Sequence, residues 1–341
     1  MKNLYKNKSY WLYRLRHTRV EEFNWIAKRA LRLDHTSTSF YSTPANWQHN
    51  FDQTKKVARI IRGENYSPSI FIHGVLPRSG TNIISDIIET AKNTSNRGDT
   101  PSEFPFLSSA RAFEGLYSGI LAKHRQNEQF FSGLELMAYS CSGIVKRLQN
   151  ELGDDVTPVF KMPSVYHIEL FPILFPLDKL VVVVRDGRDI IQSSIDTWRG
   201  SGRRLFLRSG DGFAKEWALS IDILSSIQEY AESNPDFSLH VLKYEDFVSD
   251  PSKSVNDLFD YLGLEVNNED MERVLNMPLR GSSQYKNDGQ PTWEPIKQPD
   301  AFSPVGRWKN WSIKEKTNFN KIAGKQLIKM GYEETSNWCN V

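Results

Sequence analysis

One stretch of the sequence has the composition of an anion-binding loop. It reads Phe71-Ile-His-Gly-Val-Leu-Pro-Arg-Ser-Gly-Thr-Asn82 and lies between an apolar segment and isoleucines at helical spacing. A loop that leads from a strand into a helix presents free backbone N–H groups and the positive end of the helix dipole, and glycine lets an anion approach the backbone. We therefore predict a phosphate-binding loop, and the alternative is an ordinary turn that binds nothing.

The spacing within this loop argues against a magnesium-nucleotide hydrolase. A Walker A loop has four residues between its glycines and a Lys before the Ser or Thr. Here five residues separate Gly74 from Gly80, and no Lys precedes Thr81. Arg78 supplies the cation instead, and its guanidinium suits bidentate contact with phosphate or sulfate. The ligands that we predict in the loop are Pro77, Arg78, Ser79, Gly80, Thr81 and Asn82.

Alternating strand and helix patterns surround this loop and would position it. Apolar runs predict strands at residues 70–72, 158–160, 179–184 and 238–242. Residues 161–163 are expected to form a turn. Helical periodicity is found at residues 83–88, 165–174, 189–198, 213–231, 252–262 and 313–330. This order predicts an α/β protein with a P-loop-like three-layer fold, in which a central, mostly parallel sheet has helices on both faces.

Three other regions complete the expected organisation. Residues 1–60 mix aromatic and basic side chains and are predicted to form a helical N-terminal extension, with the main domain at 61–341. The basic face of the extension is either a solvated surface or a docking site for an anionic membrane or substrate. Residues 99–150 are expected to form a helical insertion, and the Gly-, Ser- and Pro-rich residues 279–305 a loop over the substrate.

Composition limits the partners and the compartment. A formal net charge of +2 gives no reason to expect nucleic acid as a partner. The two cysteines, Cys141 and Cys339, are too far apart in sequence for a metal-ligand spacing, and they make no disulfide framework. We see no leader-like run and no apolar segment of membrane-span length, so we expect a cytoplasmic enzyme. No feature of the sequence indicates the oligomeric state.

Four motifs, in order along the chain, resemble the PAPS-dependent sulfotransferase superfamily. The loop is followed by Phe160-Lys-Met-Pro163, then by Val181-Val-Val-Val-Arg-Asp-Gly-Arg-Asp189 with Ser193, and then by Val241-Leu-Lys-Tyr-Glu-Asp-Phe-Val-Ser-Asp-Pro251. Gly306-Arg-Trp-Lys-Asn310 is similar to a C-terminal segment of the cytosolic members. The resemblance spans residues 69–332, with no clear match at 110–155. The motifs are closer to the tyrosylprotein, carbohydrate-type and bacterial branches than to the phenol enzymes.

The resemblance implies a donor and a set of residues that bind it. The donor would be PAPS (3′-phosphoadenosine 5′-phosphosulfate), which leaves as 3′-phosphoadenosine 5′-phosphate (PAP), with no metal ion. Arg185 and Ser193 would bind the 3′-phosphate, and Tyr244 would lie near the adenine. The family has Arg-Lys-Gly where this chain has Ala-Phe-Ser at 301–303, so Arg307 or Lys309 would substitute. The alternatives are that Arg185 pairs with a neighbouring Asp and that Tyr244 is a packing residue.

The resemblance also suggests the catalytic groups. Arg78 would stabilise the leaving phosphate, and Lys161 would add charge near the sulfuryl group unless it is a surface lysine. Glu103 is our choice for the base that takes the acceptor proton, because members of the tyrosylprotein branch have a Glu at a comparable distance after the loop. The chain offers other titratable groups as alternatives: His73, which we expect to be a core residue, His124, His167 and Glu114.

These observations favour transfer of a sulfuryl group from PAPS to a hydroxyl. The acceptor class is open between a glycan, a peptide tyrosine, a lipid and a small molecule. One rival is a P-loop kinase or nucleotide hydrolase, which needs a loop Lys and a magnesium-binding carboxylate. The other is a non-catalytic nucleotide-binding protein that keeps the fold and lacks a base.

Overall fold

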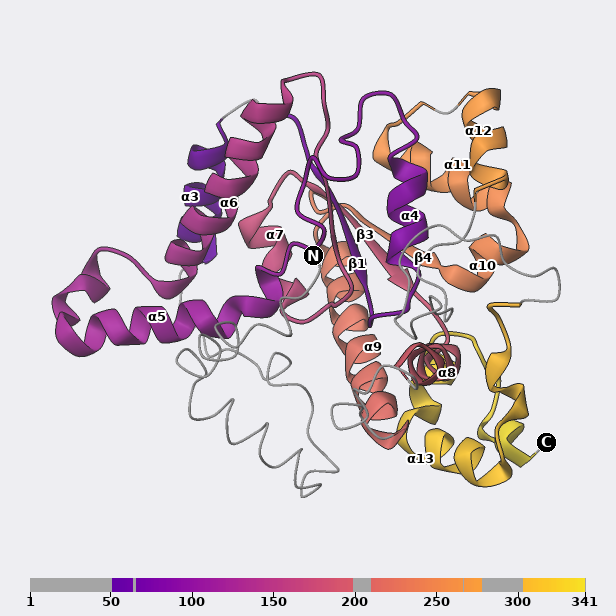
Figure 1. Ribbon diagram of the computed structural model, residues 1–341. Coiled ribbons are helices and arrows are strands. Elements are labelled where there is room, and N and C mark those ends of the chain that lie inside the picture. Colours follow the sequence, from indigo (N-terminus) through magenta and orange to yellow (C-terminus); the bar gives the residue numbers. More distant parts are fainter. Residues whose placement is uncertain (1–50, 64–65, 199–209, 266, 278–302, 341) are drawn as a thin grey trace, which may run out of the picture.

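A computed structural model of the protein describes residues 51–63, 66–198, 210–265, 267–277 and 303–340 (Figure 1). Most of the predicted N-terminal extension and nearly all of the expected loop at 279–305 lie outside these residues. No helix in the described ranges is long and apolar enough to cross a membrane.

Four parallel strands form the centre of the molecule. They are β1 (Ile70–Gly74), β2 (Val159–Met162), β3 (Lys179–Val184) and β4 (Leu239–Lys243), in the spatial order β2-β1-β3-β4. In β3 the five residues from Leu180 to Val184 are all buried, as expected of a central parallel strand that is covered on both faces. The carboxyl ends of all four strands therefore lie at the same edge of the sheet.

Helices cover both faces of this sheet. Side chains of Phe71, Leu180 and Val182 point into one core, which is formed with α3 (Phe51–Arg62), α6 (Gly133–Leu152), α7 (Phe171–Leu174), α9 (Gly210–Ser233) and α13 (Ile313–Lys329). Ile72 and Val181 point into a second core with α4 (Thr81–Ile88), α10 (Tyr244–Ser249), α11 (Pro251–Leu262) and α12 (Asn268–Leu275). Figure 1 shows these two helical layers on either side of the strands. The predicted α/β fold is confirmed.

Two local predictions after β1 are wrong. Lys161 and Met162 belong to β2 and not to a turn, because they pair with β1, Lys161 opposite Ile72 and Met162 opposite His73. The helix predicted at 165–174 is reduced to a 3₁₀ turn, Ile168–Leu170, and to α7. His167 interrupts it with a left-handed φ of 60°, a conformation that cannot continue a right-handed helix.

The region predicted as a helical insertion contains two long helices. These are α5 (Ala110–Lys123) and α6, and the latter begins with a capping box in which Ser132 and Glu135 exchange hydrogen bonds. α6 packs on α3, whereas α5 extends away from the sheet (Figure 1). One more helix, α8 (Gly187–Trp198), follows β3 directly.

A buried ion pair fastens α3 to the amino-terminal edge of the sheet. The Arg62 guanidinium donates to both carboxylate oxygens of Asp178 at 2.9 Å, and both side chains are fully buried. Asp178 also accepts a hydrogen bond from the backbone N–H of Ser69 at 2.7 Å. The pair thus joins α3, the start of β1 and the turn that leads into β3.

Replacing Asp178 with Ala is expected to lower the free energy of unfolding by about 3–5 kcal/mol, because the Arg62 charge would stay buried without a partner. Urea unfolding followed by circular dichroism measures this. Glu151→Ala is the control, because it breaks an exposed pair with Arg147 on α6, and such pairs contribute little. Equal unfolding midpoints for the two variants would show that the buried pair has no special role.

Candidate functional site

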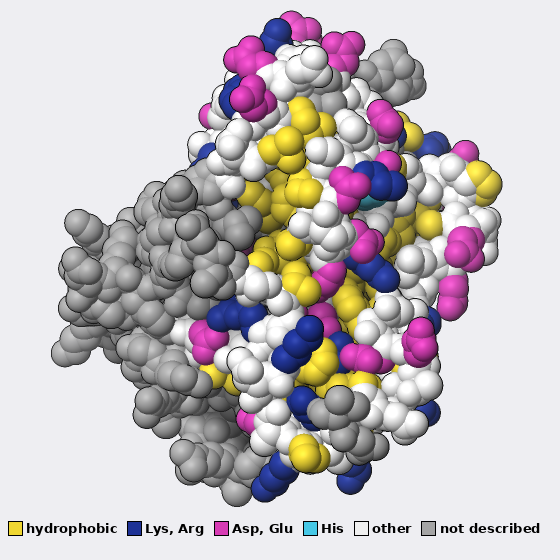
Figure 2. All heavy atoms as spheres, turned by 90° about the vertical axis from the view of Figure 1, so that its right-hand side faces the viewer, with side chains coloured by type: hydrophobic (Ala, Val, Ile, Leu, Met, Phe, Trp, Pro, Cys, Tyr) yellow, Lys and Arg dark blue, Asp and Glu magenta, His cyan; other side chains and the backbone are white. Residues whose placement is uncertain are grey.

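The carboxyl-terminal edge of the sheet brings the predicted residues together. The loop at 75–80 follows β1, Lys161 lies near the end of β2, Arg185 follows β3 and Tyr244 follows β4. In parallel α/β sheets this edge is where ligands bind. In the coloured part of the face seen in Figure 2, basic and acidic side chains are interspersed, so the placement of single residues matters more than the overall charge.

Close packing explains the two glycines of the loop. A Cβ atom at Gly74 would lie 2.8 Å from the Cγ2 atom of Thr81. Gly80 has a φ of 107°, and a Cβ atom there would lie 2.5 Å from the Tyr244 ring. The loop backbone therefore lies directly against Tyr244, which is itself buried.

Ser79 shapes the loop and does not offer its hydroxyl to a ligand. Its Oγ donates to the carbonyl of Leu76 at 2.6 Å and accepts from the N–H of Leu76 at 3.1 Å. The side chain is buried. The sequence suggested two hydroxyls as anion donors, those of Ser79 and Thr81. The Ser79 hydroxyl is thus already used within the loop, and Thr81 lies at the start of α4.

Arg78 occupies a strained conformation at the tip of the loop. Its φ is 81°, a left-handed value that costs a residue with a Cβ atom roughly 1–2 kcal/mol. Its Nε donates to the Oγ of Ser193 at 3.1 Å, and its carbonyl accepts from Nη1 of Arg185 at 2.9 Å. Strain of this kind persists where the surrounding contacts hold it, often at binding sites. Three residues predicted to bind the donor are therefore in direct contact.

Arg185 is a buried cation whose described hydrogen bonds go to neutral oxygens, although its charge also opposes the rise that burial causes in the pKa of Asp189 and of Glu245. Besides the carbonyl of Arg78, it donates through Nη2 to the carbonyl of Pro304 at 2.5 Å, and its guanidinium carbon lies 4.7 Å from the centroid of the Tyr244 ring. Within the described residues its Nε has no hydrogen-bond partner. The side chain is only 5% exposed.

The two neighbouring aspartates have other partners. The alternative, an ion pair between Arg185 and a neighbouring Asp, is therefore not found among the described residues. Asp186 binds Arg188, which donates from Nε to both of its oxygens at 3.0 and 3.1 Å. Asp189 accepts backbone N–H groups of Gly306 and Arg307 at 2.8 and 2.7 Å. Asp189 thus holds the C-terminal motif against the first turn of α8.

The two basic residues of that C-terminal motif differ in their surroundings. Nη2 of Arg307 forms an ion pair with Asp196 on α8 at 2.6 Å. Lys309 lies in the 3₁₀ turn Arg307–Asn310 with an exposed side chain. The motif and the residues just before it reach the site mainly through backbone groups, the carbonyl of Pro304 and the N–H of Gly306.

Lys161 lies inside a polar cluster and is not an isolated surface lysine. Its Nζ donates to Oδ1 of Asn82 at 2.5 Å. Burial lowers the pKa of Lys161, and the charges of Glu103 and Glu89 oppose this shift. Desolvation raises the pKa of Glu103 above 4.5, although its side chain is exposed at the surface, and the charge of Lys161 partly opposes this. The predicted base and the predicted catalytic cation are thus neighbours.

Sequence reasoning missed Glu89 in this cluster. Its Oε1 accepts from the Oγ of Ser85 at 2.8 Å, and burial raises its pKa while Lys161 lowers it. Asn82, Ser85 and Glu89 lie three and four residues apart, which places them on one face of a helix. This spacing is the sequence feature that could have identified Glu89.

The remaining candidates for the base have no described contact with Lys161. His73 is buried with its Nδ1 2.6 Å from the carbonyl of Ser164, and burial lowers its pKa to about 4, so it is the core residue that we expected. His167 is buried beside Glu169. His124 is exposed after α5, and Glu114 lies near Arg111.

A second residue missed by sequence reasoning is Glu245, next to Tyr244. It accepts the N–H of Asp186 at 2.9 Å and the hydroxyl of Tyr332 at 3.1 Å. Burial raises its pKa to about 7. Its partners come from segments far away in the sequence, so no local pattern identifies it.

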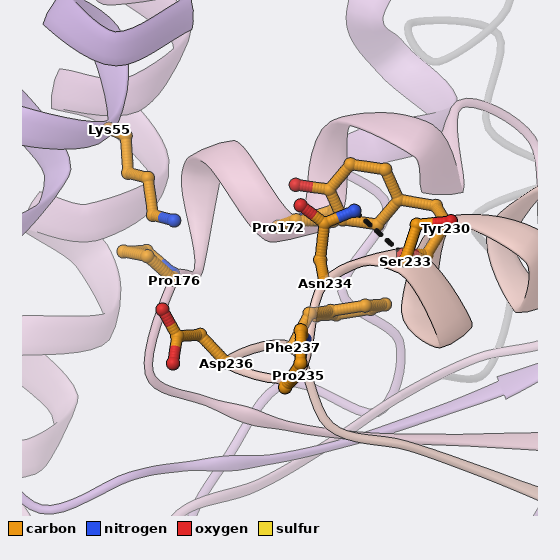
Figure 3. A pocket seen from close by; sticks show the side chains of 9 residues that line it. All are labelled: Lys55, Pro172, Pro176, Tyr230, Ser233, Asn234, Pro235, Asp236 and Phe237. Atoms are coloured by element: carbon orange, nitrogen blue, oxygen red, sulfur yellow. Dashed lines mark hydrogen bonds between the residues drawn. The ribbon is translucent and has the colours of Figure 1, made fainter.

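A separate small cavity lies near the amino ends of β3 and β4. Its volume is about 150 Å³, and Figure 3 shows Lys55 and Asp236 among the side chains that line it, with Tyr230 and Phe237 beside them. None of the predicted site residues lines it. In the described part of the chain there is no cluster of three or more His, Cys, Asp or Glu side chains that could hold a metal ion.

Comparison with solved structures finds sulfotransferase-related chains that align over most of their length at low identity. The sulfotransferase domain of an olefin synthase from Synechococcus is 16% identical, with 76% of this chain and 94% of that chain covered and a TM-score of 0.46. A mouse sulfotransferase complexed with PAP is 14% identical, with 84% and 93% covered and a TM-score of 0.43. Retinol dehydratase in complex with androsterone and PAP is 18% identical, with 80% and 85% covered and a TM-score of 0.44.

Sequence comparison gives the family. No curated protein matches the chain. The profile of the Sulfotransferase family matches residues 68–268, which is more than half of the chain and includes the loop, Lys161, Arg185 and Tyr244. The resemblance that four ordered motifs indicated is therefore confirmed, and this chain belongs to the sulfotransferase family.

Proposed function

We propose that the protein transfers the sulfuryl group of PAPS to a hydroxyl-bearing acceptor, and that residues 61–341 form the transferase domain. The observation that carries the proposal is the environment of Arg185. Arg185 has a buried guanidinium whose described hydrogen bonds go to two carbonyl oxygens and whose Nε has none. The charges of Asp189 and Glu245 act on it, but among the described residues neither carboxylate forms an ion pair with it. A buried guanidinium that is hydrogen-bonded only to neutral oxygens leaves room for an anion to complete its environment. A phosphate of the donor would be that anion.

The surrounding residues fit the rest of such a donor. Ser193 is hydrogen-bonded to Arg78, whose carbonyl accepts from Arg185, so the Ser193 hydroxyl and the Arg185 guanidinium both contact Arg78, where the 3′-phosphate would bind. The loop backbone from Arg78 to Asn82 leads into the amino end of α4, which favours the 5′ end of the donor through N–H groups and the helix dipole. Tyr244 packs against Gly80 and offers its ring to the adenine.

Catalysis would divide between the loop and the Lys161 cluster. The acceptor oxygen attacks sulfur in line as the bond from sulfur to the bridging oxygen breaks, and the electron pair leaves on the 5′-phosphate. Arg78 stabilises that charge, and Lys161 stabilises the sulfuryl oxygens. Glu103 takes the proton of the acceptor hydroxyl. The acceptor is expected to be selected by the helical insertion at 99–150, which includes Glu103.

Replacing Arg185 with Ala is expected to weaken PAP binding by about 10- to 100-fold, the worth of a hydrogen bond to a charged group. The measurement is metal-free titration calorimetry of PAP, ADP and Mg-ATP with the wild type and the variant. Arg147→Ala is the control, because Arg147 is exposed on α6 and should leave affinity unchanged. Tighter binding of Mg-ATP than of PAP would favour the kinase alternative.

Replacing Glu103 with Gln is expected to lower kcat by about 10²–10⁴-fold while PAP affinity stays unchanged, because a base acts only in the chemical step. The rate of PAP release from PAPS is measured with tyrosyl peptides, glycans and phenols as acceptors. Glu114→Gln is the matched control within the insertion. Unchanged turnover in Glu103→Gln would remove it as the base, and PAP binding without turnover in the wild type would favour a non-catalytic protein.

The pH profile tests the same assignment. A base acts as the carboxylate, so activity is lost as the pH falls through its pKa. Because desolvation raises the pKa of Glu103 and Lys161 lowers it, the acidic limb of kcat/KM should lie above pH 4.5 and move to higher pH in Lys161→Met. A limb that stays in place in this variant would contradict the pairing.

A further inference from the structure

The charged residues of the loop after β3 contact two different parts of the chain. Arg185 contacts the anion-binding loop through the carbonyl of Arg78. Arg188, three residues further on, contacts Glu333 near the C-terminal end of the chain. Asp186 reaches the same end through Glu245, which accepts both its N–H and the hydroxyl of Tyr332. A single short turn therefore links the proposed 3′-phosphate subsite to residues that follow α13.

Arg188 is the centre of this link. It is only 2% exposed, and besides Asp186 it binds Glu333 through Nη1. Its guanidinium carbon lies 3.6 Å from the ring centroid of Trp308 and 4.4 Å from that of Trp338. The two indole rings are nearly perpendicular, at 82°. Cations on aromatic faces are attracted by the ring quadrupole, most strongly for Arg and Trp when water is excluded.

Two further contacts attach the same C-terminal segment to the donor edge of the sheet. The hydroxyl of Tyr332 donates to Glu245, whose other oxygen accepts the N–H of Asp186. Lys243, the last residue of β4, donates to the carbonyl of Met330 at 2.6 Å. The backbone between Arg185 and Arg188 is thus held from the C-terminal side at both Asp186 and Arg188.

This arrangement has a consequence for Arg185. Its guanidinium reaches two carbonyl oxygens and the Tyr244 ring, and a small rotation of the turn would misdirect it. Binding groups need to be held within fractions of an ångström by the residues behind them. Among the described contacts of Arg185, the indole N–H of Trp217 donates to its backbone carbonyl at 3.0 Å, and the backbone that follows is held through the partners of Asp186 and Arg188.

We propose that residues 332–339 are a positioning element of the donor site, which aligns Arg185 with the 3′-phosphate by holding Arg188 between Trp308, Trp338 and Glu333. The inference rests on the proposed function, and it assigns to the C-terminal segment a part in recognising the 3′-phosphate. These residues act through Arg188 and are not expected to touch the donor.

The chain offers a matched pair of tryptophans for the test. Trp338 and Trp311 both pack against Phe319, with ring centroids 6.4 and 5.9 Å away. Each indole N–H donates one hydrogen bond of 2.9 Å, to Asn320 and Gln192 respectively. The described aromatic contacts of Arg188 are with Trp308 and Trp338. Trp311→Ala therefore removes similar packing and leaves the contact between Arg188 and Trp338 in place.

The quantity to measure is the ratio of the affinities for PAP and for adenosine 5′-phosphate, which lacks the 3′-phosphate. Calorimetry on the full chain is expected to show that Trp338→Ala reduces this ratio about tenfold, equal to about 1.4 kcal/mol. Glu333→Gln should reduce it in the same direction, Trp338→Phe should restore part of it because a phenyl ring still attracts the cation, and Trp311→Ala should keep the wild-type ratio.

The outcomes separate this inference from the proposed function. A wild type that binds both nucleotides equally would overturn the proposed donor, and the inference with it. A wild type that prefers PAP, with the same ratio in Trp338→Ala and Glu333→Gln, would overturn the inference alone. An equal loss in Trp311→Ala would show that packing in general is responsible and would also overturn it. If Trp338→Ala does not fold, Glu333→Gln and Trp338→Phe decide.

Discussion

The site depends on the burial of one cation, the guanidinium of Arg185. It enters the low-dielectric interior because it follows β3 directly and because two loops turn their carbonyl groups toward it, those of Arg78 and Pro304. These contacts hold Arg78 in its left-handed conformation and bring the C-terminal motif to the sheet. Neutral acceptors offset only part of the cost of burying a charge. The remainder favours an anionic ligand at this position.

A second buried arginine shows what a purely structural solution looks like. At the opposite edge of the sheet Arg62 is fully buried, but Asp178 meets it with both oxygens at 2.9 Å and takes a further hydrogen bond from Ser69. That pair carries its own counter-charge and so needs no ligand. The same residue type therefore stabilises the fold at one edge and leaves positive charge for an anion at the other.

The sequence predicted what depends on neighbours along the chain. Four valines in a row predicted β3, because a central strand is apolar on both faces, and Arg185 could then be placed at its end. The glycines of the loop predicted that an anion could approach the backbone. In the structure Gly80 packs against the Tyr244 ring, and the approach of an anion stays a prediction. The position of Lys161 within β2 and the pairing of Arg307 with Asp196 depend on partners distant in sequence. No local pattern contains that information.

The same distinction explains how the motif from Arg185 to Asp189 acquires several roles. Its spacing identifies a turn into α8, but the side chains of the turn point in different directions. Arg185 faces the loop, Arg188 faces the C-terminal tryptophans and Asp189 caps the motif at Gly306. Each contact restrains the backbone on which the next one depends, and such coupling makes the effects of substitutions non-additive. A binding residue is therefore only as well placed as the structural residues beside it in the same turn.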